Sequence, residues 1–166
     1  MNGFAEILET IAHAPIEKRA ITNHGVLNEA YAYAKPSSFS RGMRIDLGGV
    51  SILLISGTAS IDEQGRSIHI GDFRAQMRRT LDNITGLLAS EGCTWHDIVR
   101  TTCYLRDIER DYEAFNEERT AFFQQQDLDP LPASTGIQAI LCRPELLIEI
   151  EAIAMFRTDK AAAGQE

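Results

Sequence analysis

Two glutamates, Glu149 and Glu151, stand two positions apart in a segment that otherwise holds Leu, Ile and Ala. Side chains alternate along a strand, so both carboxylates are expected on the same face. A carboxyl among apolar neighbours loses hydration, which raises its pKa and suits it to transferring a proton or positioning water. The alternative for both residues is structural, as members of a salt bridge or a polar subunit interface.

A cysteine and two arginines are further candidates. Cys142 follows an apolar run, where a cysteine is commonly a small buried hydrophobe, and no histidine lies beside it in the sequence to activate it as a nucleophile. Arg143 precedes Pro144, and Arg41 follows Phe39. A guanidinium binds a carboxylate through two parallel hydrogen bonds, so either arginine could anchor an anionic substrate instead of being a solvated loop residue.

Small polar residues end or interrupt two apolar strands, at Ser56-Gly57-Thr58 and at Ser134, Thr135 and Gly136. Glycine lets the backbone approach a ligand closely, so both segments either line a polar pocket or simply turn the chain. Asn116 is either an amide that reaches into a site or an exposed helix residue. No phosphate-loop, nucleophile-elbow or H-E-x-x-H motif is present.

The elements that must position these residues follow from hydrophobic periodicity. Apolar stripes predict helices before Pro15, from Asp72 to about 91 and over 110–125, and Asp72 is a candidate N-cap. Gln76 and Asn83 share one face of the second helix and are expected to brace neighbouring backbone. Strands are predicted at 39–47, 50–58, 98–105, 133–141 and 145–156, with 52–55 suited to burial on both faces, and 15–38 is predicted to be irregular.

This order predicts an α+β fold with two helices on one face of a mixed sheet. The uncovered face must bury its apolar side chains elsewhere, and self-association is the simplest way. With 166 residues, 44% apolar and 24% charged, the chain fits a single globular domain. A helix-capping pair is also expected at Thr94 and Asp97.

The composition of the chain limits the classes of partner and the compartment that we expect. The formal charge of -8 and the absence of any Lys/Arg block longer than Arg78-Arg79 argue against nucleic acid. Cys93, Cys103 and Cys142 lack C-x-x-C spacing, which indicates reduced thiols in a cytoplasmic protein. The first residues show neither a signal peptide nor a membrane span, so no membrane partner is expected.

Several short segments form a recognisable series: Ile55-Ser56-Gly57, Gln76 with Leu81-Asp82-Asn83-Ile84, the strand from Val99 to Asp107, Phe115-Asn116, Pro132-Ala133 and the run from Ile148 to Ala154. In their order and spacing, these segments resemble the Rid (YjgF-like, L-PSP endoribonuclease-like) family. The resemblance implies a YjgF/chorismate-mutase-like mixed sheet and a homotrimer whose sheets form a central barrel, with clefts between subunits. It divides the chain into an N-terminal extension with a helix (1–35), a Rid-like domain (36–158) and a mobile tail (159–166).

The same resemblance implies an activity. Typical members hydrolyse enamines and imines without a metal or cofactor, releasing ammonia and a keto acid. Ser56-Gly57 would line the cleft with Asn116, and Glu149 would hold the attacking water. The chain departs from this pattern at Ser134, where active deaminases carry the arginine that binds the substrate carboxylate, and at Phe39, which replaces the usual cleft tyrosine.

A second resemblance, to chorismatases, rests on Phe39-Ser40-Arg41, on residues 56–60 and on residues 142–149, with Ser134-Thr135-Gly136-Ile137 similar to their small-residue segment. In those enzymes the cysteine and glutamate at the positions of Cys142 and Glu149 belong to the site. The predicted function is therefore a cofactor-free hydrolase of a small carboxylated enamine, imine or enol ether, with Glu149 and Cys142 catalytic and Arg143 or Arg41 as anion anchor. A non-catalytic metabolite sensor is the main alternative, and RNA cleavage conflicts with the acidic composition.

Overall fold

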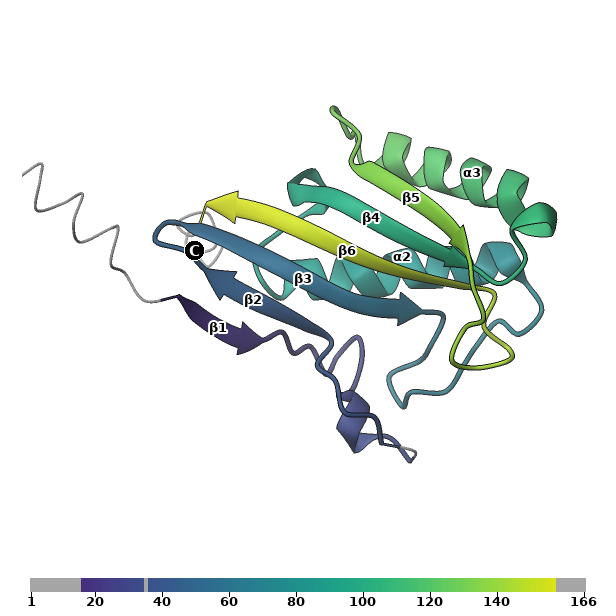
Figure 1. Ribbon diagram of the computed structural model, residues 1–166, viewed down its shortest axis with the longest axis horizontal. Helices are drawn as coiled ribbons and strands as arrows, with labels where there is room; N and C mark the ends of the chain where they lie inside the picture. The colour runs from purple at the N-terminus through teal and green to yellow at the C-terminus, as the bar shows by residue number, and fades with distance from the viewer. Residues whose placement is uncertain (1–15, 35, 158–166) are drawn as a thin grey trace, which may run out of the picture.

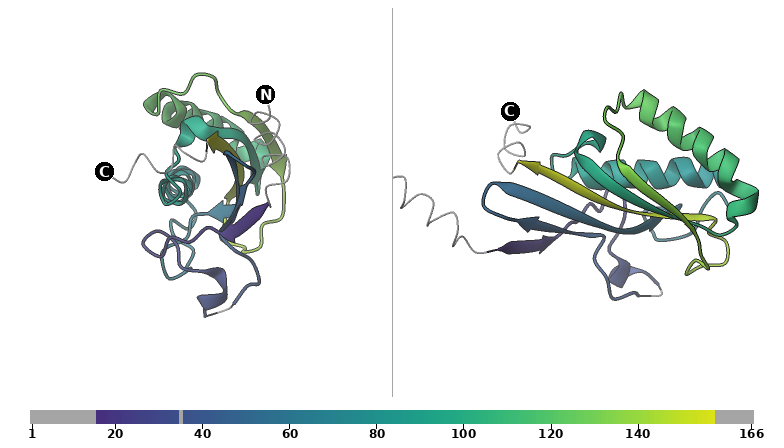
Figure 2. Two further views of the ribbon diagram at one scale, coloured as in Figure 1. Left: turned by 90° about the vertical axis from the view of Figure 1, so that its left-hand side faces the viewer. Right: turned by 45° about the horizontal axis from the view of Figure 1, so that its top comes forward.

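The computed structural model describes residues 16–34 and 36–157, which form a six-stranded sheet covered by helices on one face (Figures 1 and 2). The helix predicted before Pro15 and the tail predicted from 159 lie outside the described residues. Among the described residues, no helix is both long and apolar enough to cross a membrane.

The strands run in the spatial order β1-β2-β3-β6-β4-β5 (Figure 1). Only β4 and β5 are parallel, and helix α3 connects them, as a parallel pair requires a crossover. The remaining neighbours are antiparallel. The bounds of the strands are β1 Glu17–Ala20, β2 Gly42–Asp46, β3 Val50–Ala59, β4 Ile98–Leu105, β5 Ala133–Gln138 and β6 Ile148–Arg157.

Helices α2 (Phe73–Ala89) and α3 (Ile108–Gln125) lie on the same face of the sheet (Figure 2), which confirms the predicted α+β architecture. Short 3-10 turns form η1 (Ala30–Ala32) and η2 (Trp95–Asp97). The predicted N-cap of α2 is present, because the Asp72 carboxylate accepts a hydrogen bond from the Ala75 N–H. The predicted capping box at η2 is present as well.

The core lies between this helical face and the sheet. Met77, Ile84 and Leu88 of α2 are fully buried, and so are the inward residues of the central strands, including Leu53 and Ile148. Alternation along β6 places its even-numbered residues in this core, from Ile148 to Phe156. Glu149 and Glu151 therefore face the other side of the sheet, as their spacing predicts.

Two amides brace the backbone, as expected. The Gln76 side chain donates to the Glu145 carbonyl at 2.9 Å and accepts from the Leu147 N–H at 2.8 Å. The Asn83 amide donates to the carbonyls of Ala59 and Ile61. These bonds tie α2 to the loop before β6 and to the end of β3.

The prediction that 52–55 is buried on both faces is wrong for the isolated chain. Leu53 and Ile55 are 0% and 3% exposed, whereas Leu54 is 41% exposed. The helices cover only one face, so the other leaves Leu54, Ile137 and Met155 open. This uncovered apolar surface is the open face of the sheet.

The sequence prediction also differs from the structure at element ends. Part of the segment predicted to be irregular, 15–38, forms β1, which pairs with β2 through backbone hydrogen bonds. Its sequence, EKRA, has no apolar alternation that would predict a strand. Strand β5 ends at Gln138 and β6 begins at Ile148, because the intervening segment is a loop braced by Gln76.

Candidate functional site

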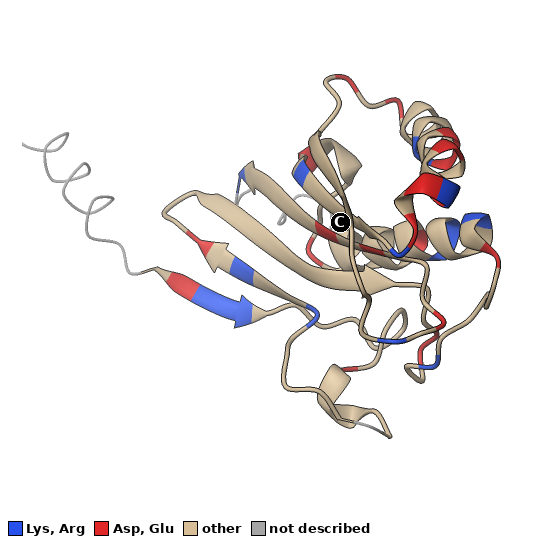
Figure 3. Ribbon diagram, turned by 45° about the vertical axis from the view of Figure 1, so that its right-hand side comes forward, with Lys and Arg blue, Asp and Glu red and all other residues tan. Residues whose placement is uncertain are grey.

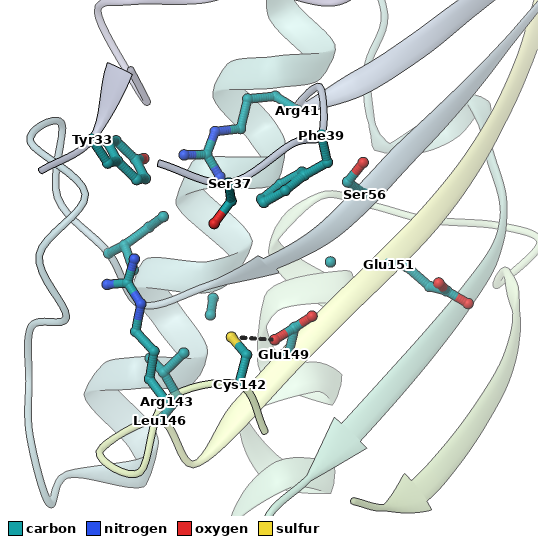
Figure 4. A pocket seen from close by; sticks show the side chains of 13 residues that line it. Tyr33, Ser37, Phe39, Arg41, Ser56, Cys142, Arg143, Leu146, Glu149 and Glu151 are labelled. Atoms are coloured by element: carbon teal, nitrogen blue, oxygen red, sulfur yellow. Dashed lines mark hydrogen bonds between the residues drawn. The ribbon is translucent and has the colours of Figure 1, made fainter. Parts of the chain in front are cut away.

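A cavity of about 490 Å³ opens where the end of β3 and the start of β6 meet the loop before β6 and the segment 33–41 (Figure 4). It contains many of the predicted site residues, namely Phe39, Arg41, Ser56, Gly57, Cys142, Arg143 and Glu149. Its other lining residues are Tyr33, Ser37, Ala59, Ile61, Leu146 and Glu151. We call it the Glu149 cavity.

A β-bulge positions the central carboxylate. Ile55 pairs with Ala152 and Thr58 pairs with Ile150, so Ser56 and Gly57 together oppose the single residue Glu151. Bulges of this kind bend a strand and change the direction of side chains near functional sites. A methyl group on Gly57 would lie 2.9 Å from Cδ of Glu149, and closer still to Oε1. The missing side chain of Gly57 therefore makes the space that the carboxylate occupies.

The environment of Glu149 favours its protonated form. Burial raises the pKa of the Glu149 carboxyl, and the nearby negative charge of Glu151 raises it further. No described basic side chain forms an ion pair with Glu149. A carboxyl of this kind can donate a proton and later take one from water.

The thiol of Cys142 lies beside the Glu149 carboxyl. Its Sγ lies 4.0 Å from Oε2 of Glu149 (dashed line in Figure 4). Burial raises the pKa of the Cys142 thiol, and the charge of Glu149 adds to this effect. A thiol held neutral is a weak nucleophile, so this environment favours a role in positioning over covalent attack.

Both predicted arginine anchors line the cavity. Arg41 is 3% exposed, and its Nε and Nη2 donate to the carbonyl of Asn28 at 3.0 and 2.9 Å. Its guanidinium lies over the Phe39 ring at 5.3 Å and over the Tyr33 ring at 4.8 Å. These contacts fix the orientation of Arg41 at the wall of the cavity.

Arg143 approaches from the loop before β6. Its Nη1 donates to the Gly65 carbonyl at 2.6 Å and to Ser67 Oγ at 3.2 Å. Figure 4 shows the guanidinium groups of Arg41 and Arg143 on the side of the cavity toward Tyr33, with Glu149 across from them. The cavity thus places positive charge opposite a protonatable carboxyl.

Ser56 lines the cavity, as predicted, and its side chain also bonds to neighbouring backbone. Its hydroxyl donates to the Ser40 carbonyl at 2.7 Å, and its N–H donates to the Arg41 carbonyl at 3.0 Å. The side chain therefore holds the segment that carries Phe39 and Arg41 against β3, while it also lines the cavity.

The other predicted binding residues do not line the Glu149 cavity. Asn116, Ser134, Thr135 and Gly136 lie instead on α3 and β5. The Ser134 hydroxyl accepts from Thr101 Oγ1 at 3.0 Å, and Thr135 Oγ1 accepts from an Arg100 Nη2 at 3.2 Å. In a single chain, the predicted site residues therefore form two separate groups.

No sequence signal predicts Tyr33 or Ser37 as cavity residues. Tyr33 and Ser37 lie in a segment without periodicity, and only tertiary packing brings them to β3 and β6. The same holds for Arg119 of α3, whose guanidinium lies against Ser134 with Nη1 at 3.2 Å from Oγ. Its place in the sequence indicates only a polar position on a helix.

Comparison with known proteins gives a consistent result. The family model described as endoribonuclease L-PSP matches residues 32–156. The 3-aminoacrylate deaminase RutC of Acinetobacter baylyi is 33% identical over 104 residues, which cover 63% of this chain and 79% of that protein. A RutC family protein of Haemophilus influenzae is 31% identical over 111 residues, covering 67% of this chain and 82% of its own length.

Solved structures agree with the sequence relatives. The YjgF gene product of E. coli superposes with a TM-score of 0.64 at 28% identity, covering 82% of this chain and 97% of that one. A protein of the conserved Rid family from Yersinia pestis, YyfA, superposes with a TM-score of 0.65 at 26% identity, covering 83% and 98%.

Proposed function

Because the chain belongs to the Rid family, whose model carries the description endoribonuclease L-PSP, we propose that it is a cofactor-free hydrolase of a small carboxylated enamine or imine. An enol ether is the third substrate class that the same chemistry would accept. The relative from Acinetobacter baylyi is named for deamination of 3-aminoacrylate, which is a carboxylated enamine. The observation that carries the proposal is the carboxyl of Glu149, with its raised pKa, facing two guanidinium groups.

The reaction needs one proton donor that can become a proton acceptor. Protonated Glu149 gives its proton to the electron-rich carbon of an enamine, which turns the neighbouring carbon into an electrophilic iminium. Water adds to that carbon while the Glu149 carboxylate takes its proton. The resulting carbinolamine expels ammonia and leaves a keto acid. An imine enters the same sequence after protonation on nitrogen.

The two arginines of the cavity are suited to binding the carboxylate of the substrate. A charge-assisted bond to a guanidinium orients the ligand and is stronger than a neutral hydrogen bond. Arg41 and Arg143 are available for this role. Because they lie across the cavity from Glu149, they would hold a ligand between their guanidinium groups and the Glu149 carboxyl.

We also propose that the chain assembles as a homotrimer with its sites between subunits. Two observations support this. The open face leaves Leu54, Ile137 and Met155 in water, and burial of such side chains by association is favourable. The second group of predicted residues, around Ser134, lies at the exposed strand β5, where a neighbouring copy could meet it.

The experiment is ammonia release from enamines and imino acids by the wild-type protein and by Glu149→Gln. We expect Glu149→Gln to abolish turnover without lowering the melting temperature or changing the assembly state. Glu113→Gln, an exposed position on α3, is the matched control and should leave turnover unchanged. Wild-type activity in Glu149→Gln would remove this residue from the mechanism.

A metabolite-binding or sensor protein is the second candidate. It is favoured by Ser134, whose short hydroxyl is bonded to Thr101 and cannot reach a ligand as a guanidinium would. Stoichiometric binding without product, across imino acids, 3-aminoacrylate and chorismate-like enol ethers, would favour the sensor over the hydrolase. RNA cleavage is the least favoured function because the formal charge is -8.

A further inference from the structure

A second cavity, of about 410 Å³, lies between α3 and the start of β5. Its walls combine a polar rim with the apolar side chains of Phe123, Leu128 and Leu131. Arg119 is the charged residue in its lining. This second cavity shares no lining residue with the Glu149 cavity.

The guanidinium of Arg119 is held in place by contacts on three sides. Nη2 donates to Asn116 Oδ1 at 2.6 Å, one helical turn earlier on α3. Nη1 lies 3.2 Å from Ser134 Oγ on β5, and the guanidinium carbon stacks 4.5 Å from the centre of the Phe115 ring. A planar group fixed in this way loses little further freedom when it binds an anion.

Its positive charge has no carboxylate partner within ion-pair distance among residues 16–34 and 36–157. The adjacent Glu118 cannot supply one, because it pairs with Arg74 and Arg78 of α2. Figure 3 shows this pattern, with basic segments on α2 and acidic segments on α3. Arg119 thus combines a preorganised guanidinium, an unneutralised charge and a cavity.

We propose that Arg119 binds the carboxylate of a small ligand whose apolar body lies against Leu128 and Leu131. Guanidinium and carboxylate form paired charge-assisted hydrogen bonds, and the apolar wall selects an acid with a short hydrocarbon body over a fully hydrated anion. On the β5 side, the guanidinium meets only the small hydroxyl of Ser134, at 3.2 Å from Nη1. This site is separate from the Glu149 cavity, which Arg41 and Arg143 line, and it rests on the proposed function only for the class of its ligand, a small carboxylic acid.

The test is a titration with 2-oxobutyrate, a keto acid with a short apolar body, followed by calorimetry. The uncharged 2-oxobutyramide serves as the matched ligand. Wild-type protein should bind the acid more tightly than the amide, and Arg119→Gln should weaken binding of the acid by about ten-fold or more. Arg119→Lys should recover only part of the affinity, because an ammonium lacks the planar fork. Arg78→Gln, which changes a salt-bridged arginine of α2, is the control and should bind like the wild type.

Equal binding of the acid by the wild type and Arg119→Gln overturns the proposal, and so does a wild type that binds acid and amide equally or not at all. A melting temperature within a few degrees of the wild type shows that Arg119→Gln is folded. Turnover separates this inference from the proposed function. Arg119-dependent binding of 2-oxobutyrate without any hydrolysis would refute the hydrolase alone, whereas hydrolysis together with 2-oxobutyrate binding that does not depend on Arg119 would refute the Arg119 site alone.

Discussion

Replacing Gly57 by alanine tests whether the Glu149 carboxylate must lie where the β3 bulge places it. The new methyl group would lie 2.9 Å from Cδ of Glu149 and 3.3 Å from its Cγ. Ordinary contact begins near 3.4 Å, so the carboxyl carbon must retreat by at least half an ångström, and Oε1 by more. The obstacle is the far end of a flexible side chain, so the fold can adjust at little cost.

The expected effect is therefore on turnover and not on stability. A misplacement of about 1 Å in a catalytic group costs on the order of 100-fold in rate. We expect Gly57→Ala to lower kcat by about 10- to 100-fold, with thermal unfolding close to that of the wild type. Steady-state ammonia release measures the rate, and calorimetry measures the melting temperature.

Gly25→Ala is the matched control, because its added methyl would meet only Asn23 Oδ1 at 3.5 Å, an ordinary contact. It should change neither rate nor melting temperature by a measurable amount. A Gly57→Ala protein that keeps the wild-type kcat would refute this prediction, because a displaced Glu149 carboxylate would then support full turnover. A Gly57→Ala protein that fails to fold would contradict the claim that only the side chain moves.

Two further predictions concern charge and assembly. Burial raises the pKa of Glu149 in the folded protein above its value in the unfolded chain. The contribution of the protonated carboxyl to stability is therefore complete below the unfolded pKa of about 4.3. It is lost as the pH rises through the pKa of the folded protein. The free energy of unfolding of Glu149→Gln, measured in urea, should therefore rise relative to the wild type between pH 4 and pH 7.5, and parallel profiles would contradict the raised pKa. Leu54→Asp, on the open face, should convert a homotrimer into monomers in analytical ultracentrifugation, whereas Ile70→Asp, at an exposed loop position, should not; a wild-type monomer would contradict the proposed assembly.

The parts of the fold that the sequence predicts are those in which a local pattern repeats. Apolar spacing locates α2 and α3, and the Asp72 carboxylate accepts the expected capping bond at the start of α2. Residues 98–105 are predicted as a strand with the bounds that the structure shows. In each of these cases the information lies within a few turns or strand residues of the element itself.

Other features depend on contacts that local patterns do not encode. Strand β1 has the polar sequence EKRA, and its pairing with β2 comes from backbone groups that every residue carries. Tyr33 and Ser37 reach the Glu149 cavity only because the segment between β1 and β2 folds across the end of β3. The spacing of Glu149 and Glu151 predicts their shared face, but it says nothing about the basic side of the cavity.

The division of the predicted residues into two groups has the same origin. Glu149 owes its position to Gly57, nearly a hundred residues away in sequence, because a bulge and a missing side chain leave room for a carboxylate. Ser134 owes its surroundings to α3, where Asn116 orients Arg119 toward β5. A sequence motif can identify Glu149 and Ser134, whereas the groups that give them chemical roles lie on other elements. For this reason Gly57→Ala and Arg119→Gln test the two groups separately, the first through the rate of the chemical step and the second through the affinity for a carboxylate.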